Sequence, residues 1–234
     1  SLQTASIGSG VEELANNTFS YCDALENVTL SDTIHTVGSS AFAYCSSLQA
    51  IVLPDSVRVI GDNAFSRCVL LSQITIPAGV ESIGEYAFYD CDALTGIVLP
   101  DSVTTLGSRA FQNCDALTYA VLSDNLEAVN AYTFYECVKL ETVDFGSSIT
   151  EIGEHAFYHC YQLTDLVFPD SLSTIGRYAF CYCPNVQKNI TFGKGLTRIG
   201  ENAFSNCNIR YMEFTGDAPA ITENCFGEDN FVAF

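Results

Sequence analysis

The segment Leu94–Cys114, LTGIVLPDSVTTLGSRAFQNC, contains every part of a unit that recurs along the whole chain. Its first part alternates inward apolar residues with outward ones and ends at a Pro-Asp-Ser turn, which predicts one short β-strand. Its second part places apolar residues three and four positions apart, which predicts a short helical or 3₁₀ turn. One copy of the unit therefore describes a strand, a turn and a compact return to the start.

The unit repeats about every 23 residues. A phenylalanine marks each copy, and we call these residues the anchors: Phe19, Phe42, Phe65, Phe88, Phe111, Phe134, Phe157, Phe180, Phe204 and Phe226. One such unit, here called a coil, cannot bury its own apolar face, whereas stacked coils share one continuous core. We therefore predict an α/β solenoid of about ten 23-residue coils, right-handed, with a parallel sheet on one face and short helical or 3₁₀ turns on the other.

The consensus Leu-x-x-Ile-x-Leu-Pro-x-Ser-Val-x-x-Ile-Gly-x-x-Ala-Phe-x-x-Cys resembles the BspA-like class of leucine-rich repeat. The resemblance covers essentially the whole chain. Departures are local: Asn130 replaces Gly, Gly146 replaces Pro, an extra residue lies near Asn189, and Cys225 replaces Ala. The resemblance implies a protein of the cell surface or extracellular space, from a host-associated bacterium or a parasitic protist, with a role in adhesion or protein binding.

The repeats predict a single domain over residues 1–234. The first coil is partial (1–22) and the last is atypical (215–234), so we expect the natural protein to extend beyond at least one end. No stretch of about 18 consecutive apolar residues occurs, and we expect no direct membrane insertion.

The chain is strongly acidic, with 28 Asp and Glu against 9 Lys and Arg and a net charge of −19. Such a surface repels phosphate groups, so nucleic acids and anionic membranes are excluded as partners.

Nine of the eleven cysteines follow an anchor by three positions: Cys22, Cys45, Cys68, Cys91, Cys114, Cys137, Cys160, Cys183 and Cys207. Disulfides are one interpretation, because stacked neighbours would lie within bridging distance. The favoured interpretation is a column of buried thiols, since each cysteine has two equivalent neighbours and a free thiol packs as a small apolar group. Cys181 lies outside this column, and we expect it to point outward, where a reactive thiol is an alternative.

Two histidines, His155 and His159, stand four positions apart, which on a helix would allow them to share a metal ion. Both positions also flank an anchor and are variable surface sites of the repeat. No third outward ligand matches them, so we predict no metal site and no cofactor.

Two further residue types recur at fixed places. Aspartate in the turn is interpreted as a backbone hydrogen-bond acceptor, with a weak calcium stripe as the alternative. Ten of the twelve tyrosines surround the anchors; we expect them to cover the core with their hydroxyl groups in water, with an aromatic binding strip as the alternative. The aspartates are Asp32, Asp55, Asp101, Asp124 and Asp170.

The outward positions of the strands are the candidate binding surface, because the repeat imposes no residue type there. None of them is Lys, Arg, His or Cys, so an anionic ligand is not expected. Tyr119 is the expected central anchor, because aromatic residues dominate interface energetics. The candidate residues are Gln73, Thr75, Val98, Tyr119, Val121, Thr142, Asp144, Asp165, Tyr211 and Glu213.

No arrangement of nucleophile, base and orienting group stands out, and no glycine-rich phosphate loop is present, so we expect no catalysis. The expected function is binding of a protein, a peptide or a neutral glycan, and extracellular proteins of a host are among the expected partners. We expect the chain to be a monomer. There are two alternatives: a structural spacer that presents another domain, and an intracellular protein-interaction scaffold.

Overall fold

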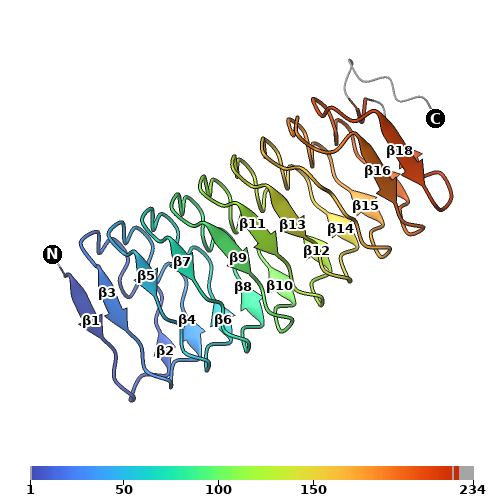
Figure 1. Cartoon of the computed structure of the whole chain (residues 1–234). Helices are drawn as coiled ribbons and strands as arrows, with labels where there is room; N and C mark the ends of the chain where they lie inside the picture. The colour runs from blue at the N-terminus through green and yellow to red at the C-terminus, as the bar shows by residue number, and fades with distance from the viewer. Residues whose placement is uncertain (1, 223, 227–234) are drawn as a thin grey trace.

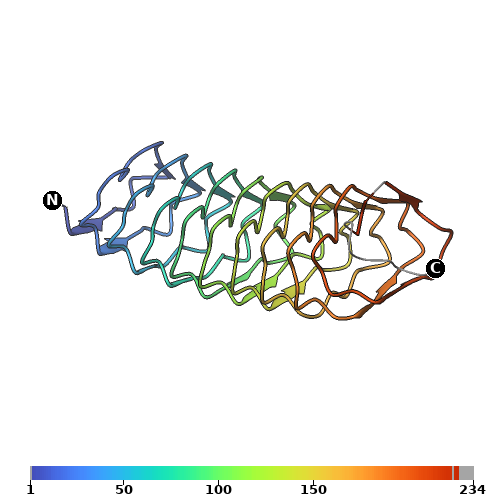
Figure 2. The same cartoon turned by 90° about the horizontal axis from the view of Figure 1, so that it is seen from above.

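The computed structural model describes residues 2–222 and 224–226, and these form one elongated solenoid (Figure 1). The chain makes about nine turns of about 23 residues, and all strand pairs that define the sheets are parallel. The predicted solenoid with stacked coils is therefore confirmed. Seen from above, the coils follow one another along the axis, from the N-terminal coils in blue at one end to the C-terminal coils in red at the other (Figure 2).

One side of the rod, here called the strand face, carries the strands that the alternating pattern predicts. Tyr119–Val121 pairs in register with the strand before it and the strand after it, which places Tyr119 between Gly96 and Thr142. The strands of this face are β1 (Thr4–Ser6), β3 (Asn27–Thr29), β5 (Ala50–Ile51), β7 (Gln73–Ile74), β9 (Gly96–Val98), β11 (Tyr119–Val121), β13 (Thr142–Asp144), β16 (Asn189–Phe192) and β18 (Tyr211–Phe214).

A second row of strands, which the sequence analysis did not predict, runs beside the first (Figure 1). It comprises two parallel five-stranded sheets made of two-residue strands. The strands are β2 (Glu13–Leu14), β4 (Thr36–Val37), β6 (Val59–Ile60), β8 (Ser82–Ile83), β10 (Thr105–Leu106), β12 (Ala128–Val129), β14 (Glu151–Ile152), β15 (Thr174–Ile175), β17 (Arg198–Ile199) and β19 (Ala220–Ile221).

A glycine follows most strands of this second row because the backbone of the preceding coil passes directly beside it. A Cβ atom added to Gly61 would lie 2.7 Å from the backbone nitrogen of Ser39. Asn130 occupies the corresponding place in the sixth coil, where its side-chain Nδ2 donates a hydrogen bond to the carbonyl oxygen of Leu106. The second row is interrupted at this coil, between β10 and β12.

The third side, here called the turn face, consists of turns that contain the anchors. The predicted helical or 3₁₀ turns are not found among the described residues. The residues two positions before and two positions after each anchor from Phe19 to Phe204 have positive φ, for example 56° at Ser40 and 63° at Tyr44 around Phe42. A helix cannot continue through such left-handed residues.

The hydrogen bonds of the turn face explain why it avoids helix. Ala41 N–H donates to the carbonyl of Gly38 three positions back, at 3.1 Å, whereas the next residue, Phe42, donates to Ala64 in the following coil, at 2.8 Å. Local and inter-coil bonds alternate in this way through the turns. A helix would direct its N–H groups to its own carbonyls and would leave the coils without these lateral bonds.

The core is the stack of side chains between the three faces. The anchor rings lie nearly parallel, with Phe88 and Phe111 at 5.2 Å between centroids and 3° between planes. Anchors from Phe42 to Phe204 are at most 1% exposed. Offset stacking of this kind is a favoured arrangement of aromatic pairs, so the core is both apolar and ordered along the whole rod.

Candidate functional site

The predicted binding residues all lie on the outer side of the strand face or beside it. Nine of the ten are exposed, and Val121 is half-buried. The parallel register aligns them in rows, so Val121 stands beside Val98 on one side and Asp144 on the other. The alternation that the sequence predicted therefore places these residues along one face of the rod, although the seventh coil forms no strand there.

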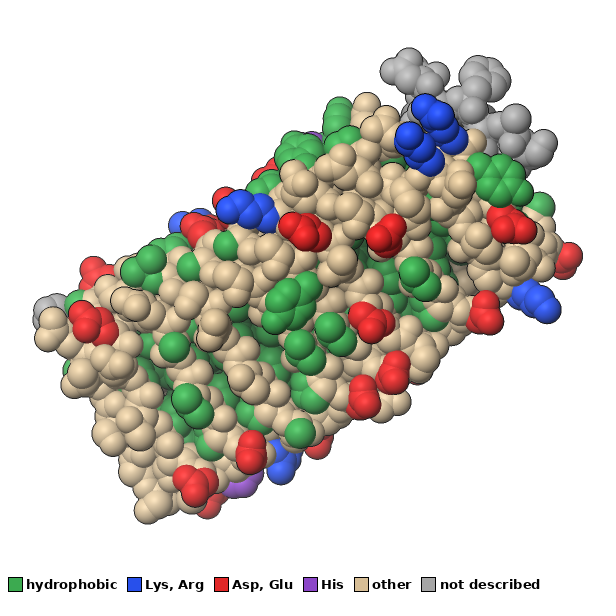
Figure 3. All heavy atoms as spheres, viewed as in Figure 1, with side chains coloured by type: hydrophobic (Ala, Val, Ile, Leu, Met, Phe, Trp, Pro, Cys, Tyr) green, Lys and Arg blue, Asp and Glu red, His purple; other side chains and the backbone are tan. Residues whose placement is uncertain are grey.

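The centre of this surface is apolar, and Tyr119 lies at its middle. Its ring covers the backbone of Gly96, because an added Cβ atom on that glycine would collide with the ring atoms of Tyr119. Val98 is 53% exposed beside it, and Val52 and Val167 are exposed further along the face. Apolar side chains are seen in the middle of this view of the molecule (Figure 3). A glycine beneath an aromatic ring gives the ring a flat support, so Tyr119 presents an extended apolar surface to solvent.

The charge of this face is one-sided. Asp144, Asp165 and Glu213 are exposed at the outward positions of its C-terminal half. Glu213 also accepts a hydrogen bond from the Thr191 hydroxyl at 3.3 Å. No Lys, Arg or His occupies an outward position of the nine strands that the structure describes on this face. The face therefore offers an apolar centre followed by an acidic region.

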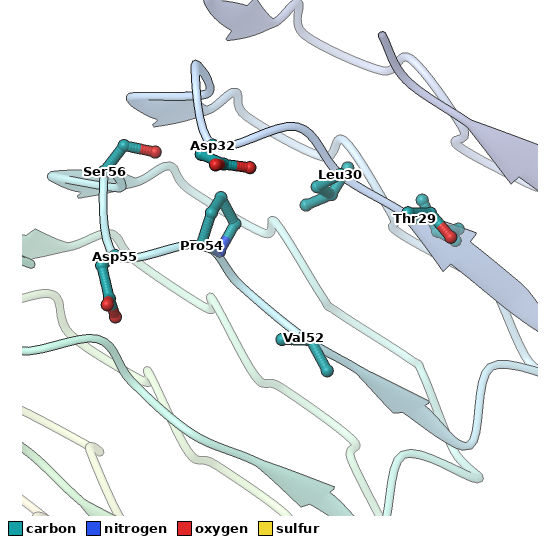
Figure 4. A pocket seen from close by; sticks show the side chains of 8 residues that line it. Thr29, Leu30, Asp32, Val52, Pro54, Asp55 and Ser56 are labelled. Carbon is teal, nitrogen blue, oxygen red and sulfur yellow. The ribbon is translucent and has the colours of Figure 1, made fainter. Parts of the chain in front are cut away.

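A shallow depression of about 590 Å³ lies at the N-terminal end of the strand face, which the sequence analysis did not identify. It lies between two adjacent coils, and Figure 4 shows Leu30 and Asp32 on one of them and Val52 and Pro54 on the other. Its lining residues are Val28, Thr29, Leu30, Asp32, Val52, Pro54, Asp55 and Ser56. It extends the candidate surface toward the turns.

Aspartates in the turns accept hydrogen bonds from the backbone of the next coil. The Asp101 carboxylate accepts a hydrogen bond from Asp124 N–H at 3.1 Å, and Asp124 accepts one from Ser147 N–H at 2.8 Å. At these two positions the predicted acceptor role is confirmed, and it joins neighbouring coils. Across residues 2–222 and 224–226, no group of three or more His, Cys, Asp or Glu side chains is arranged to hold a metal ion.

The column cysteines are free thiols, and all of them except the half-buried Cys22 are buried. The Cys114 thiol donates a hydrogen bond to the carbonyl oxygen of Phe88 at 3.2 Å. Burial raises the pKa of the Cys114 thiol well above its ordinary value of 9.0. A protonated, buried thiol is neither a nucleophile nor a metal ligand, so the column is structural.

The two cysteines outside the column are also buried. Cys181 is 2% exposed, so the expectation that it points outward is wrong. Burial raises the pKa of its thiol to about 11. The reason is that Ser205 and Asn206 of the following coil lie against the Cys181 side chain. Cys225 is 2% exposed, and burial raises the pKa of its thiol to about 12.

The two histidines belong to separate stacks on the turn face. The His155 ring lies between Tyr132 and Tyr178, with centroids 4.8 and 4.9 Å away. Desolvation by these neighbours lowers the pKa of His155. His159 Nδ1 lies 3.4 Å from a carboxylate oxygen of Glu136 in the preceding coil. Each histidine therefore continues a column of its own.

Within the described part of the chain, no helix is long and apolar enough to cross a membrane.

Comparisons with known proteins agree with this geometry. A family model for the BspA type leucine-rich repeat region matches residues 1–118 and 104–232, in six copies. A leucine-rich repeat protein of T. pallidum is 31% identical, with a TM-score of 0.65, over 68% of this chain and 77% of that one. No curated protein matches the chain.

Two further solved structures share the fold at lower identity. A leucine-rich repeat protein from Bacteroides ovatus is 24% identical over 98% of this chain and 72% of that one, with a TM-score of 0.64. The pneumococcal vaccine antigen PcpA is 21% identical over 99% of this chain and 62% of its own length, with a TM-score of 0.66.

Proposed function

Because the chain belongs to the BspA-type leucine-rich repeat family, we propose that it is a non-catalytic protein-binding module of the cell surface or extracellular space that uses its strand face. The family is typically associated with protein binding, and one protein of the same fold is a vaccine antigen. The proposed partner is a protein or a peptide, including an extracellular protein of a host.

The observation that carries this proposal is the exposed apolar centre of the strand face. Val52 is 82% exposed, Val98 53% and Tyr119 45%, although the repeat leaves these positions open to any polar residue. Exposed apolar residues gathered on one face are a feature of protein-interaction surfaces. Aromatic residues near the centre of an interface contribute most to binding energy, which supports Tyr119 as the proposed anchor.

The acidic end of the face adds selectivity. Asp144 and Asp165 would repel an acidic partner and attract a basic one, which influences the association rate more than the affinity. We expect a partner that combines an apolar contact for Tyr119 with basic side chains toward the C-terminal half.

The test is capture of purified extracellular host proteins from a defined panel by the immobilised chain, compared with two variants. Tyr119→Ala removes the proposed anchor, and Tyr161→Ala removes an exposed tyrosine on the turn side, away from the strand face. Loss of capture with Tyr119→Ala alone supports the proposal. Equal capture by all three proteins places the interface elsewhere, and no capture by any of them favours a structural spacer.

A further inference from the structure

A second concave feature lies on the turn face, far from the strand-face residues in each coil. It is a trough of about 400 Å³ that crosses the first four coils, and we call it the turn-face trough. Its lining residues are Asn17, Ser20, Tyr21, Ser40, Ala43, Tyr44, Asn63, Ser66, Arg67, Tyr86 and Tyr89.

The trough exists because the residue directly after each anchor is small in the first three coils. Ser20, Ala43 and Ser66 form its floor, whereas the next coil has Tyr89 at the same position. The rings of Tyr86 and Tyr89 meet edge to face at 5.5 Å between centroids and close this end. The concavity is therefore confined to one stretch of the rod.

One wall of the trough is a rigid stack. The rings of Tyr21 and Tyr44 lie 4.4 Å apart and nearly parallel. The guanidinium of Arg67 continues the stack, 5.3 Å from the Tyr44 ring and 5.7 Å from the Tyr89 ring. A wall held by stacking loses little freedom when a ligand binds, which favours affinity.

The floor and the opposite wall carry polar groups without partners. Ser66 is only 5% exposed, yet its hydroxyl forms no hydrogen bond with any residue that the structure describes. The side chains of Asn17, Ser40 and Asn63 likewise form none within the described chain. Asn17 is exposed, Ser40 and Asn63 are half-buried, and Ser66 lines the floor of the trough. Their polar groups are therefore available to donate and accept hydrogen bonds with a ligand.

The trough carries no net charge of its own. Arg67 is the one charged residue among its lining residues, and its Nε lies 3.3 Å from Asp90 Oδ2. A ligand here therefore needs no charge, and a polyanion would be repelled by the acidic chain as a whole.

The backbone of the trough is already engaged. Asn63 N–H donates to Glu85 and Arg67 N–H donates to Tyr89, each at 2.7 Å across the coils. An extended peptide cannot add to this face through main-chain hydrogen bonds, which is how strand addition gains its affinity. Recognition must come from amides, hydroxyls and aromatic rings.

We propose that the turn-face trough binds a neutral oligosaccharide. Its hydroxyl groups would pair with Ser66 and the two asparagines, and its apolar C–H edges would lie against the tyrosines. A few placed polar groups between aromatic walls are the usual composition of a small-ligand site. This site is independent of the strand face, so one chain would bind a protein and a glycan on different sides.

The experiment is saturation-transfer NMR and calorimetric titration of the full chain with three neutral trisaccharides: maltotriose, mannotriose and chitotriose. Ser66→Tyr fills the floor with the residue that the next coil already holds at this position, at Tyr89. Ser205→Tyr is the matched control, because Ser205 occupies the same position in a coil outside the trough. Ser20→Tyr serves as a second filling variant if Ser66→Tyr does not fold.

We expect at least one trisaccharide to bind, about tenfold or more weaker to Ser66→Tyr, with affinity retained by Ser205→Tyr and by Tyr119→Ala. The proposal is overturned if none of the three binds, or if the filling variants bind as well as the unmodified chain. It is also overturned if a proline-rich peptide binds the trough and the sugars do not.

Discussion

The thiol of Cys91 donates a hydrogen bond to the carbonyl oxygen of Phe65 in the preceding coil, at 3.2 Å. The same bond recurs in every pair of coils from Cys45 to Cys207, always to the anchor of the coil before. The cysteine is thus a small apolar residue that also satisfies a buried carbonyl. A disulfide between neighbours would remove these donors, which explains why free thiols suit the column.

The thiol column predicts a loss of stability at alkaline pH. Burial raises the pKa of Cys45 to about 12 and that of Cys91 well above 9.0. The unfolded chain therefore loses these protons first, and the free energy of unfolding should be constant below pH 9 and fall above it. The measurement is urea unfolding between pH 7.5 and 10 in a reducing, oxygen-free buffer.

Cys91→Ala is the control for this dependence. Removing one thiol should make the decline shallower by up to about 1.4 kcal/mol per pH unit. An unfolding free energy that does not change up to pH 10 would contradict the assignment.

The anchor column predicts a large cost for a single truncation. Phe111 is fully buried, and its ring stacks on Phe88 at 5.2 Å and on Phe134 at 5.4 Å. Phe111→Ala should lower the free energy of unfolding by about 3–5 kcal/mol, because it removes apolar contact and leaves a cavity. Val52→Ala, at an exposed position, should change it by less than about 0.5 kcal/mol. Similar effects of the two substitutions would refute the stacked core.

The repeat period made most of this fold predictable. Once the anchors recur every 23 residues, stacking, parallel strands and the two buried columns follow from geometry. The turn face was not predictable in the same way, because inward residues at three- and four-residue steps suit both a helix and a series of turns. A usable signal was present: Asn and Asp, which tolerate positive φ, recur two positions from the anchors, as at Asn63, Asp90 and Asn113.

The candidate site was predictable only in part. Alternation in β11 indicates that Tyr119 points outward, but its support by Gly96 depends on the register of two coils. The turn-face trough was missed because it results from small side chains at Ser20, Ala43 and Ser66. A column of small residues does not indicate a concavity in the sequence, because the concavity depends on where the larger residues around it lie in space.

The glycines of the second strand row predict a steric cost. A Cβ atom on Gly61 would lie 2.7 Å from Ser39 N and 2.9 Å from Gly38 C, and the backbone cannot move aside without separating two coils. Gly61→Ala should therefore destabilise the chain by about 1–3 kcal/mol. Gly8→Ala is the matched control, since nothing lies within 4 Å of its Cβ position. Thermal unfolding compares the two, and an equal midpoint for both variants would disprove the close approach.

The strand face is interrupted in the seventh coil, and we predict that the Gln187 side chain stabilises the chain at this point. No strand is assigned at residues 164–167, and instead the Gln187 amide bonds both backbone groups of Leu166, accepting from its N–H at 2.8 Å and donating to its carbonyl at 2.9 Å. The extra residue of the eighth coil brings Gln187 into this position, so a side chain replaces the missing backbone pairing.

Gln187→Leu keeps the side-chain size and removes both bonds, which leaves the buried backbone of Leu166 unpaired. We expect a loss of about 1–3 kcal/mol in the free energy of unfolding and faster hydrogen exchange at the Leu166 amide. Gln162→Leu, at an exposed position, should alter neither quantity. Unchanged exchange at Leu166 in the Gln187 variant would show that the backbone finds another partner and that the amide is dispensable.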